Sequence, residues 1–469
     1  MSERLRVAAA ITAALFFGGC ANLIPPYQRP AAPVAASYPQ ETTPASVAGV
    51  PVAAEIEWQR FFADPRLQRL IGIALQNNRD LRIAVLDIEQ ARAAYQVRRA
   101  DELPSVGVGA AVQRQPGSTG KLVNTYSVGL ALASYELDLF GRVRSLSQAA
   151  LAQYLATDEA RKAVQISLIS TLANTYMSQL ADDELLRVTR QTLVTREDSL
   201  KLTKLKFDYG AASELDYRQA ESLLESARAS LAQALRQRAL DEDTLVLLAG
   251  QPLPADLPAP LALNAQQLST DLPAGLPSDL LERRPDIRAA EQQLISANAN
   301  IGAARAAFFP RISLTGNFGT ASTELSGLFK SGSFAFTGAG QLLQPLFDAG
   351  RNQANLEVAK VDRDIAVAQY ERAIQSAFRE VSDALAGRAT FGEQLRAQLA
   401  QAHAEEVRFR LSDLRYRNGA SSYLEVLDAQ RSLFAAQQAV VQVQAAQVQN
   451  LVTLYRVLGG GWKEPVPAQ

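Results

Sequence analysis

The chain has 469 residues, of which 48% are hydrophobic, and its formal net charge is -1. This balanced charge removes the electrostatic reason to expect a nucleic-acid partner. No apolar run approaches the ~20 residues that a membrane-spanning helix needs, so if the protein crosses a membrane it must do so by strands.

The first twenty residues have the features of a bacterial export signal. Arg4 and Arg6 form the positive end, and residues 7–17 form a short apolar core. Two glycines then precede Cys20, the only cysteine in the chain. We expect a signal peptide at 1–19 and a lipoprotein with an acylated Cys20, the covalent lipid being the only added group. The alternative is an ordinary signal peptide that happens to contain a cysteine.

Residues 20–63 form a segment rich in proline, alanine, serine and threonine. Such a composition favours extended or polyproline structure over a packed element. We interpret this segment as a connection between the lipid anchor and the body of the protein.

Two switches from helix to strand organise the rest of the chain. They occur at Pro104 and Pro310, because proline lacks a backbone N–H and restricts the residue before it, so a helical pattern ends there. An alternating pattern follows each proline, which predicts strands with one apolar face. The positions of that face in the second copy are Ile312, Leu314, Gly316 and Phe318. We interpret Gly316, Gly338 and Gly340 as points of close backbone approach or of bending.

An internal repeat explains why the switch occurs twice. LKFDYGAASELDYRQA (205–220) aligns with LRYRNGASSYLEVLDA (414–429) without gaps. The first repeat, 64–264, is predicted to contain a helix from 64 to about 102, a β-hairpin at 105–135, a long helix at 142–207 and a helix at 213–249. The second, 271–462, is predicted to contain a helix at 278–309, a β-hairpin at 311–343, a long helix at 349–417 and a helix at 421–458, before a tail at 463–469.

Four one-sided strands constrain the assembly. They are too few to enclose a lumen, and open strand edges are not tolerated in lipid. Three chains would supply twelve strands, within the range of outer-membrane barrels. The long helices, at roughly 66 residues and roughly 100 Å of rise, would form a second, helical tube.

Four stretches carry a resemblance to a known family. They are ERRPDIRAAEQQLISANANIGAARAAFFPRISLTGNFG (282–319), ELDLFGRVR (136–144), QPLFDAGR (344–351) and YRNGASSYLEVLDAQRSL (416–433). Each resembles the TolC-like outer-membrane efflux channels, in their lipoprotein (NodT-type) branch.

The resemblance implies an α+β fold in a homotrimer: a twelve-stranded outer-membrane β-barrel, four strands per chain, continuous with a long periplasmic α-helical barrel. It implies a channel of a tripartite efflux pump that passes drugs, dyes or metals to the outside of a bacterial cell. The implied partners are a periplasmic adaptor protein and an inner-membrane pump, most often of the resistance-nodulation-division type. The alternatives are a duct for an ATP-driven protein secretion system and a soluble periplasmic coiled-coil scaffold.

The resemblance also places a gate near the turns at Gly210 and Gly419. The family's gating contacts join the positions of Asp216 and Tyr416, and acids at the positions of Glu425 and Asp428 line the constriction as a ring. A further contact uses an arginine at the position of Ser421, which this sequence lacks. In three chains, Glu425 and Asp428 would supply six carboxylates, and such a ring favours cations.

The alternative for these acids is helix capping. Ser213 and Asp216, like Ser422 and Glu425, have the spacing of a capping box, and acids in a first helical turn suit the helix dipole. Asp428 is one turn further along and is not needed as a cap, so we favour a lumen-facing position for it.

No residue pattern indicates an enzyme or a metal site. His403, the only histidine, falls inside a predicted long helix without a nearby ligand set, so we interpret it as a solvated helix residue. We found no glycine-rich phosphate loop and no Ser-His-Asp arrangement.

Overall fold

The computed structural model describes residues 22–39, 53–116, 118, 120–266, 268, 272 and 279–462. The predicted signal peptide, Cys20 and the tail at 463–469 lie outside these residues. The order of elements is η1 (Ala53–Glu55), α2 (Trp58–Phe61), α3 (Pro65–Asn77), α4 (Arg79–Ala100), β1 (Val106–Pro116), β2 (Leu122–Leu137), α5 (Arg142–Asp208), α6 (Glu214–Ala249), η2 (Leu263–Ala265), α7 (Leu280–Arg283), α8 (Pro285–Ala306), β3 (Arg311–Ser322), η4 (Leu325–Gly327), β4 (Phe334–Leu343), α9 (Arg351–Arg417) and α10 (Tyr423–Val457).

The chain divides into two compact units. The first contains the sheet and the helix segments next to it, within Met1–Ala31, Leu86–Glu159 and Arg288–Ala373. The second is helical and lies within Ala32–Val85, Ala160–Ile287 and Ile374–Gln469. Among the residues described in either unit, no helix has both the length and the apolar character needed to cross a bilayer.

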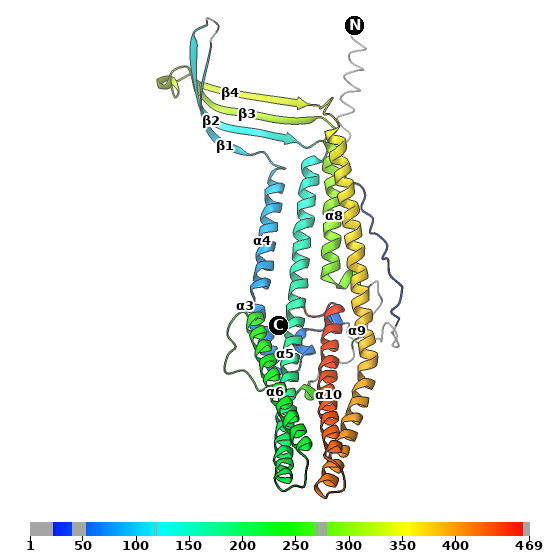
Figure 1. Cartoon of the computed structure of the whole chain (residues 1–469). Helices are drawn as coiled ribbons and strands as arrows, with labels where there is room; N and C mark the ends of the chain where they lie inside the picture. The colour runs from blue at the N-terminus through cyan, green and yellow to red at the C-terminus, as the bar shows by residue number, and fades with distance from the viewer. Residues whose placement is uncertain are drawn as a thin grey trace, which may run out of the picture. The chain divides into compact units, whose positions relative to one another are not determined.

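The first unit is built on one antiparallel sheet with the order β1-β2-β3-β4 (Figure 1). Its register places Leu130 opposite both Val108 and Phe318. Because residues directly opposite each other in a sheet share a face, the predicted apolar positions of the strands lie on one side. Within the chain, β1 and β4 each have one unpaired edge.

A bulge in β2 keeps this apolar face continuous. The register passes from Leu132 opposite Gly316 to Tyr135 opposite Leu314. Between them Ser134 has a φ of 53°, so the strand gains one residue relative to its partner. Tyr135 and Leu137 therefore join the face that carries Leu132, although simple alternation would place them on the other side.

The strand glycines contact the backbone at a different place from the one predicted. A Cβ on Gly129 would lie 2.5 Å from the carbonyl oxygen of Phe318, and a Cβ on its partner Gly319 would overlap Val128. By contrast, the nearest atom to a Cβ on Gly316 is 3.5 Å away, and a Cβ on Gly338 meets nothing within 4 Å. Close backbone approach at Gly316, Gly338 and Gly340 was therefore a wrong prediction, because alternation does not show which backbones lie closest, while bending at these glycines stays a prediction.

The segment from Asn22 to Ala31 is bound along α8 in the first unit. Arg29 donates two hydrogen bonds to the buried carboxylate of Glu291, at 2.7 and 2.9 Å, and Tyr27 donates a third at 3.0 Å. Asn298 donates to the carbonyl oxygen of Pro25 at 2.8 Å. These contacts hold an extended, proline-rich segment against α8.

Both helices that precede a strand pair are interrupted, although the sequence analysis predicted unbroken helices. The first breaks at Asn78, between α3 and α4, and the second at Arg284, between α7 and α8. Asn78 accepts from the N–H of Leu81 at 2.9 Å and so caps α4. Arg284 precedes Pro285, and a residue before proline is disfavoured in helical conformation.

The two breaks belong to equivalent joints in the second unit. The side-chain amide of Asn78 donates to the carbonyl oxygen of Leu248, at the end of α6, at 3.0 Å. The guanidinium of Arg284 donates to the carbonyl oxygen of Val457, at the end of α10, at 3.2 Å. Since the last carbonyl groups of a helix have no partner inside it, each break satisfies the helix that returns to it.

Glycine completes each joint. Gly250 follows α6 with a φ of 72°, and Gly459 follows α10 with a φ of 85°. A Cβ on Gly250 would overlap the backbone of Asn77, and a Cβ on Gly459 would lie 2.7 Å from the carbonyl oxygen of Arg283. Only glycine allows both the left-handed conformation and this close approach.

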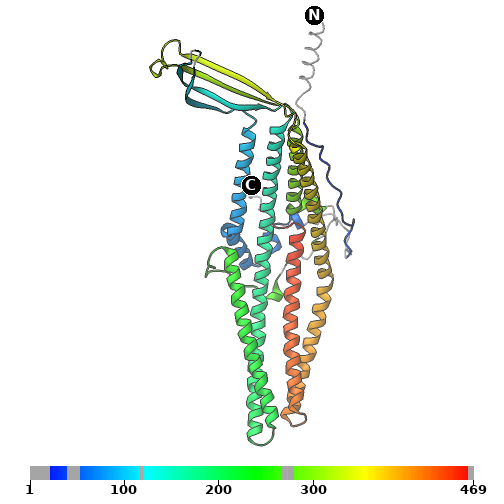
Figure 2. The same ribbon diagram turned by 45° about the horizontal axis from the view of Figure 1, so that its top comes forward.

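Paired helices continue the second unit beyond these joints, with α6 beside the end of α5 and α10 beside the end of α9 (Figures 1 and 2). Asp64 connects the start of α3 with α5 and with the segment after α6. Its buried carboxylate caps α3 through the N–H of Arg66 at 2.8 Å and accepts from the hydroxyl of Tyr176 and the amide of Gln266, each at 2.8 Å.

We expect Gly250→Ala to destabilise the protein by roughly 2 kcal/mol or more, since a left-handed conformation alone costs ~1–2 kcal/mol with a Cβ and the clash with Asn77 adds to it. The control is Gly392→Ala, inside α9, where a Cβ meets nothing within 4 Å and alanine should stabilise by ~0.5–1 kcal/mol. Thermal unfolding of the purified variants, followed by circular dichroism, measures the difference. Equal unfolding temperatures for the two variants would contradict the joint.

Candidate gate at the helical hairpin tips

Both hairpin tips of the second unit are closed by the same backbone motif. In the first, the N–H of Ala211 donates to the carbonyl oxygen of Lys206 at 2.7 Å, and Gly210 has a φ of 72°. In the second, Ala420 donates to Arg415 at 2.8 Å, and Gly419 has a φ of 73°. This is the Schellman arrangement, in which a left-handed residue ends the helix and satisfies its last carbonyl groups.

Asp216 lies in the first turn of α6 and completes a capping box with Ser213. Its carboxylate accepts from the N–H and the hydroxyl of Ser213, at 3.2 and 2.8 Å, while the hydroxyl accepts from the N–H of Asp216 at 3.1 Å. The capping interpretation of Asp216 is therefore confirmed. A gating contact of Asp216 with Tyr416 stays a prediction.

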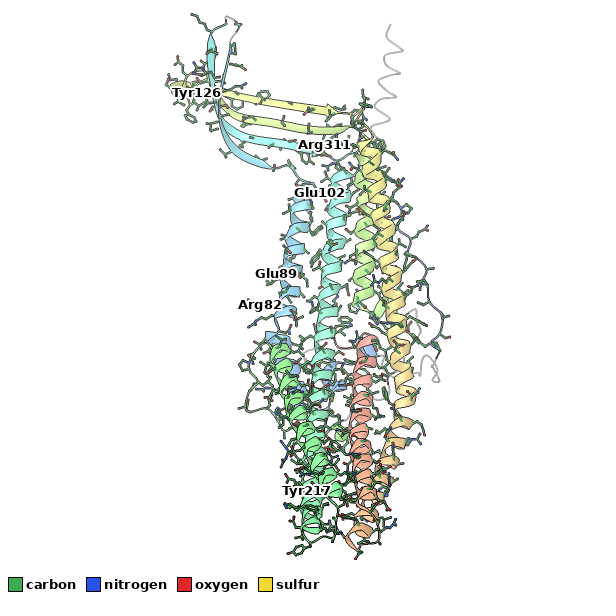
Figure 3. The ribbon with its side chains drawn as sticks, in the orientation of Figure 1. Arg82, Glu89, Glu102, Tyr126, Tyr217 and Arg311 are labelled. Atoms are coloured by element: carbon green, nitrogen blue, oxygen red, sulfur yellow. The ribbon has the colours of Figure 1, made fainter. Side chains whose placement is uncertain are left out.

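Tyr416 is buried between the two hairpins. Lys206 donates to its carbonyl oxygen at 3.0 Å and places its amine 3.8 Å from the centre of its ring. Burial raises the pKa of the Tyr416 phenol, and the negative charge of Asp216 raises it further. Tyr416 also packs with Tyr423, Val426 and Leu427 of α10 in the core that joins the tips. Tyr217 lies in the first turn of α6, at the same end of the hairpin (Figure 3).

The two acids of the second hairpin are paired with arginines. Glu425 lies 3.3 Å from Arg415, and Asp428 pairs with Arg408. The capping box predicted at Ser422 and Glu425 is not formed, since the Ser422 side chain makes no capping hydrogen bond. The pairing offers Glu425 a stronger partner, a full positive charge, than the N–H of Ser422.

These pairs reduce the negative charge that the predicted ring would present. Arg415 lies near the end of α9, and Arg408 is two turns earlier on that helix, so both reach across to α10. No sequence pattern points to Arg408 as the partner of Asp428, because only the pairing of α9 with α10 brings the two together. The Ser421 hydroxyl makes no hydrogen bond within the described part of the chain. The lumen-facing position of Glu425 and Asp428 stays a prediction.

The helix-to-strand switches lie in the first unit. Pro104 is between α4 and β1, and Pro310 is directly before β3. Beside them, the carboxylate of Glu136 binds Arg142 at 2.7 Å and Arg311 at 2.6 Å. Arg311 is at the base of the sheet, where α8 passes into β3 (Figure 3). One carboxylate thus connects β2, α5 and β3.

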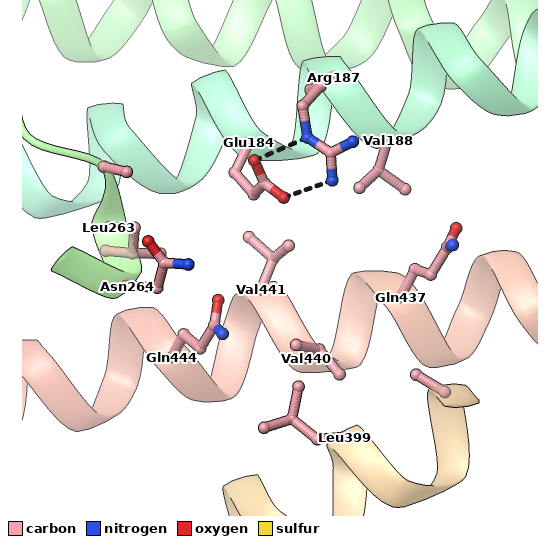
Figure 4. Close-up of a pocket in the computed structure, with 12 residues that line it drawn as sticks. Glu184, Arg187, Val188, Leu263, Asn264, Leu399, Gln437, Val440, Val441 and Gln444 are labelled. Atoms are coloured by element: carbon pink, nitrogen blue, oxygen red, sulfur yellow. Dashed lines mark hydrogen bonds and ion pairs between the residues drawn. The ribbon is translucent and has the colours of Figure 1, made fainter. Parts of the chain in front are cut away.

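A pocket of about 450 Å³ lies in the second unit (Figure 4). It is lined by α5, the segment 262–264, α9 and α10, with aliphatic side chains such as Val188 and Leu399 and amides such as Asn264 and Gln437. Glu184 and Arg187 form an ion pair at its wall, with a closest distance of 2.7 Å. The lining residues include one ion pair, amides and aliphatic side chains, and they do not form a catalytic arrangement.

His403 is the one residue that the sequence raised as a possible catalytic or metal-binding group. His403 is exposed on α9. Across the ranges that the structure describes, no group of three or more histidine, cysteine, aspartate or glutamate residues could hold a metal ion.

Comparison with known proteins gives one consistent result. The family model described as "Outer membrane efflux protein" matches residues 70–251 and 276–460. The toluene efflux pump outer membrane protein TtgC and the antibiotic efflux pump outer membrane protein ArpC, both of Pseudomonas putida, are each 48% identical to the chain over 465 residues, covering 97% of the chain and 95% of the relative. The crystal structure of the open state of the Neisseria gonorrhoeae MtrE outer membrane channel is 44% identical, with a TM-score of 0.86, over 94% of this chain and 99% of that one.

We expect Ser213→Ala to weaken the first turn of α6 by about 1 kcal/mol, the usual cost of losing an N-cap side chain. The repeat supplies the control, because the equivalent Ser422 makes no capping bond and Ser422→Ala should cost less. Amide hydrogen exchange in the first turns of α6 and α10 measures each local opening. If both variants sped up exchange equally, the asymmetry between the two caps would be wrong.

Proposed function

This chain belongs to the outer membrane efflux protein family and is an outer-membrane efflux channel that extends into the periplasm, and from that membership we propose that three copies assemble into one continuous duct. The observation that carries the trimer is the sheet: four strands in one chain, with unpaired edges on β1 and β4. An open edge in lipid leaves backbone groups without partners at a cost of several kcal/mol each. Pairing β4 of one copy with β1 of the next removes every edge.

The apolar face of the sheet supports its placement in lipid. Val108 is 80% exposed and Phe336 is 73% exposed in the single chain, and water would penalise so large an apolar surface. A bilayer around a closed ring of strands would cover that face.

We further propose that the channel serves a tripartite pump and works with a periplasmic adaptor and an inner-membrane transporter. The names of the relatives, which include efflux of toluene and of antibiotics, support small apolar or amphipathic molecules as its cargo. A lipid on Cys20 would hold the N-terminal segment at the membrane, and the contacts of Arg29 and Tyr27 with Glu291 would then fix where that segment leaves the membrane. No catalytic step is part of this function.

We expect the protein to migrate as a heat-sensitive trimer from outer-membrane fractions, because the closed sheet and the paired helices make dissociation slow. A tag at the C-terminus and gentle cross-linking of cell envelopes should recover an adaptor together with a proton-driven transporter, and an untagged strain is the control. Monomers confined to the soluble fraction would contradict the channel. Recovery of an ATP-driven exporter in place of these two partners would instead assign the channel to protein secretion.

The charge of the tip is tested by current recordings in planar bilayers. We expect Glu425→Ala with Asp428→Ala to lower cation selectivity, and Arg408→Ala with Arg415→Ala to raise it, because each arginine offsets one acid. Exposed ion pairs contribute up to ~1 kcal/mol, so the changes should be a few-fold.

The matched control for these recordings is Glu393→Ala, which breaks an exposed pair with Arg396 on α9, outside the hairpin tips. Its selectivity should equal that of the unmodified protein. Unchanged selectivity in both tip variants would remove the acid ring from the mechanism.

A further inference from the structure

The α9 helix is apolar on two opposite sides in the first unit. One side is buried against the rest of the chain and carries Ala359, Ala366 and Tyr370. The opposite side is exposed, and its residues are spaced four and three apart: Ala354, Val358, Val361, Ile365 and Ala368. Such spacing is typical of the contact face of a coiled coil. Val358 is 59% exposed in the single chain, so this apolar face has no cover there.

The α4 helix has the same two-sided character. Ile88, Ala91 and Tyr95 are half-buried on one side. On the other side, exposed residues recur with the same spacing: Leu86, Gln90, Ala93 and Val97. A helix that is apolar on both sides is normally covered on both. Within the described ranges of the chain, α4 and α9 therefore each present one apolar face, here called the free face, to solvent.

The positions of α4 and α9 limit what can cover their free faces. α4 leads into β1 and α9 follows β4, which are the two edge strands of the sheet. α5 and α8 continue the two central strands, and Ser296 of α8 donates to the carbonyl oxygen of Ala149 of α5 at 2.9 Å. Asn352 of α9 donates to the carbonyl oxygen of Ala307, just after α8, at 3.1 Å. α4 and α9 are thus the outer helices of a row of four (Figures 1 and 2).

We propose that the free face of α9 packs against the free face of α4 in the next copy of the chain, and that this helical seam continues the pairing of β4 with β1. The inference rests on the proposed trimer and identifies the helix contact that closes it. Joining the two strand edges brings the start of α9 beside the end of the neighbouring α4, because only residues 101–105 and 344–350 separate these helices from their strands.

The two free faces match near the sheet. α4 runs towards the sheet and α9 runs away from it, so the neighbours are antiparallel. Both helices rise by ~1.5 Å per residue, so positions counted from the sheet ends lie at equal depth. This count places Val97 beside Ala354 of the next copy. One turn further from the sheet it places Ala93 beside Val358, so a large side chain meets a small one at both levels.

The match continues further along the helices. Gln90 comes to lie beside Val361, and Leu86 beside Ile365. A single polar residue in an otherwise apolar seam fixes the register of the two helices at some cost in stability. Gln90 is the only polar residue of the four on the free face of α4, so it would select this pairing over one shifted by a turn.

The test uses cysteine pairs in the full-length protein, isolated as a trimer from outer-membrane fractions. After mild oxidation, Val97→Cys with Ala354→Cys should give covalent dimers and trimers on non-reducing gels, because each copy offers one thiol to each neighbour. The matched control is Arg98→Cys with Ala354→Cys, since Arg98 is also exposed but points ~100° away around the helix. Cys20 remains in every variant, so the single variants show whether it takes part.

The register is tested by a second cysteine pair, further from the sheet. Leu86→Cys with Ile365→Cys should cross-link as well as the first pair does. Trimers in which neither designed pair cross-links would overturn the seam and leave the trimer standing. A protein without trimers would instead refute the assembly on which the seam rests. Cross-links from Ala354→Cys to a protein of another mass would assign the free face of α9 to a different partner.

A charge placed in the seam measures its contribution to the trimer. Val361→Asp buries a carboxylate without a partner, which is costly, so the trimer should dissociate at a lower temperature than the unmodified protein on gels. The control is Gln353→Asp, which adds the same charge at an exposed position of α9 outside the free face and should leave the dissociation temperature unchanged. Equal dissociation temperatures for the two variants would contradict the seam.

Discussion

The helical body depends on one interaction made twice, the hydrogen bond from the residue at a helix break to the carbonyl group that ends the returning helix. Asn78 makes it to Leu248, and Arg284 makes it to Val457. The two side chains differ in charge and length, yet each satisfies a helix end that would otherwise be buried without a partner. Arg284 needs more support, because its buried guanidinium also binds Asp286 at 2.6 Å and Glu380 at 3.1 Å. Both repeats thus use a backbone carbonyl group at the end of the returning helix as the acceptor, whereas the donor side chain differs between them.

The charges at the tip of the second hairpin are paired. At the tip of α9 and α10, exposed acids meet arginines, so the charges are balanced and remain open to solvent and salt. These pairs follow from which face of α9 lies against α10, since neither arginine is a near neighbour of its acid along the chain.

Much of the architecture can be predicted from the sequence. The long helix at 142–207 could be predicted because no glycine or proline interrupts it, its counterpart at 349–417 because the sequence repeats, and the strand faces because the apolar residues alternate. Glycine itself indicates the turns at Gly210 and Gly419. Pro285 indicates the helix break at Arg284, although the sequence analysis did not use it. The break at Asn78 is marked only by an asparagine, which is also common in turns and caps.

The sequence by itself determined the doubled order of helices and strands, the apolar side of each strand and the membership of a channel family, because these depend on local periodicity and on motifs. The tertiary structure decided the partners: the pairing of Arg408 with Asp428 and the contact of Gly129 with Gly319. A helix or strand pattern fixes the direction of a side chain but not the register of the neighbour it meets. Only packing sets that register, and with it the pairing of the charges at the tip.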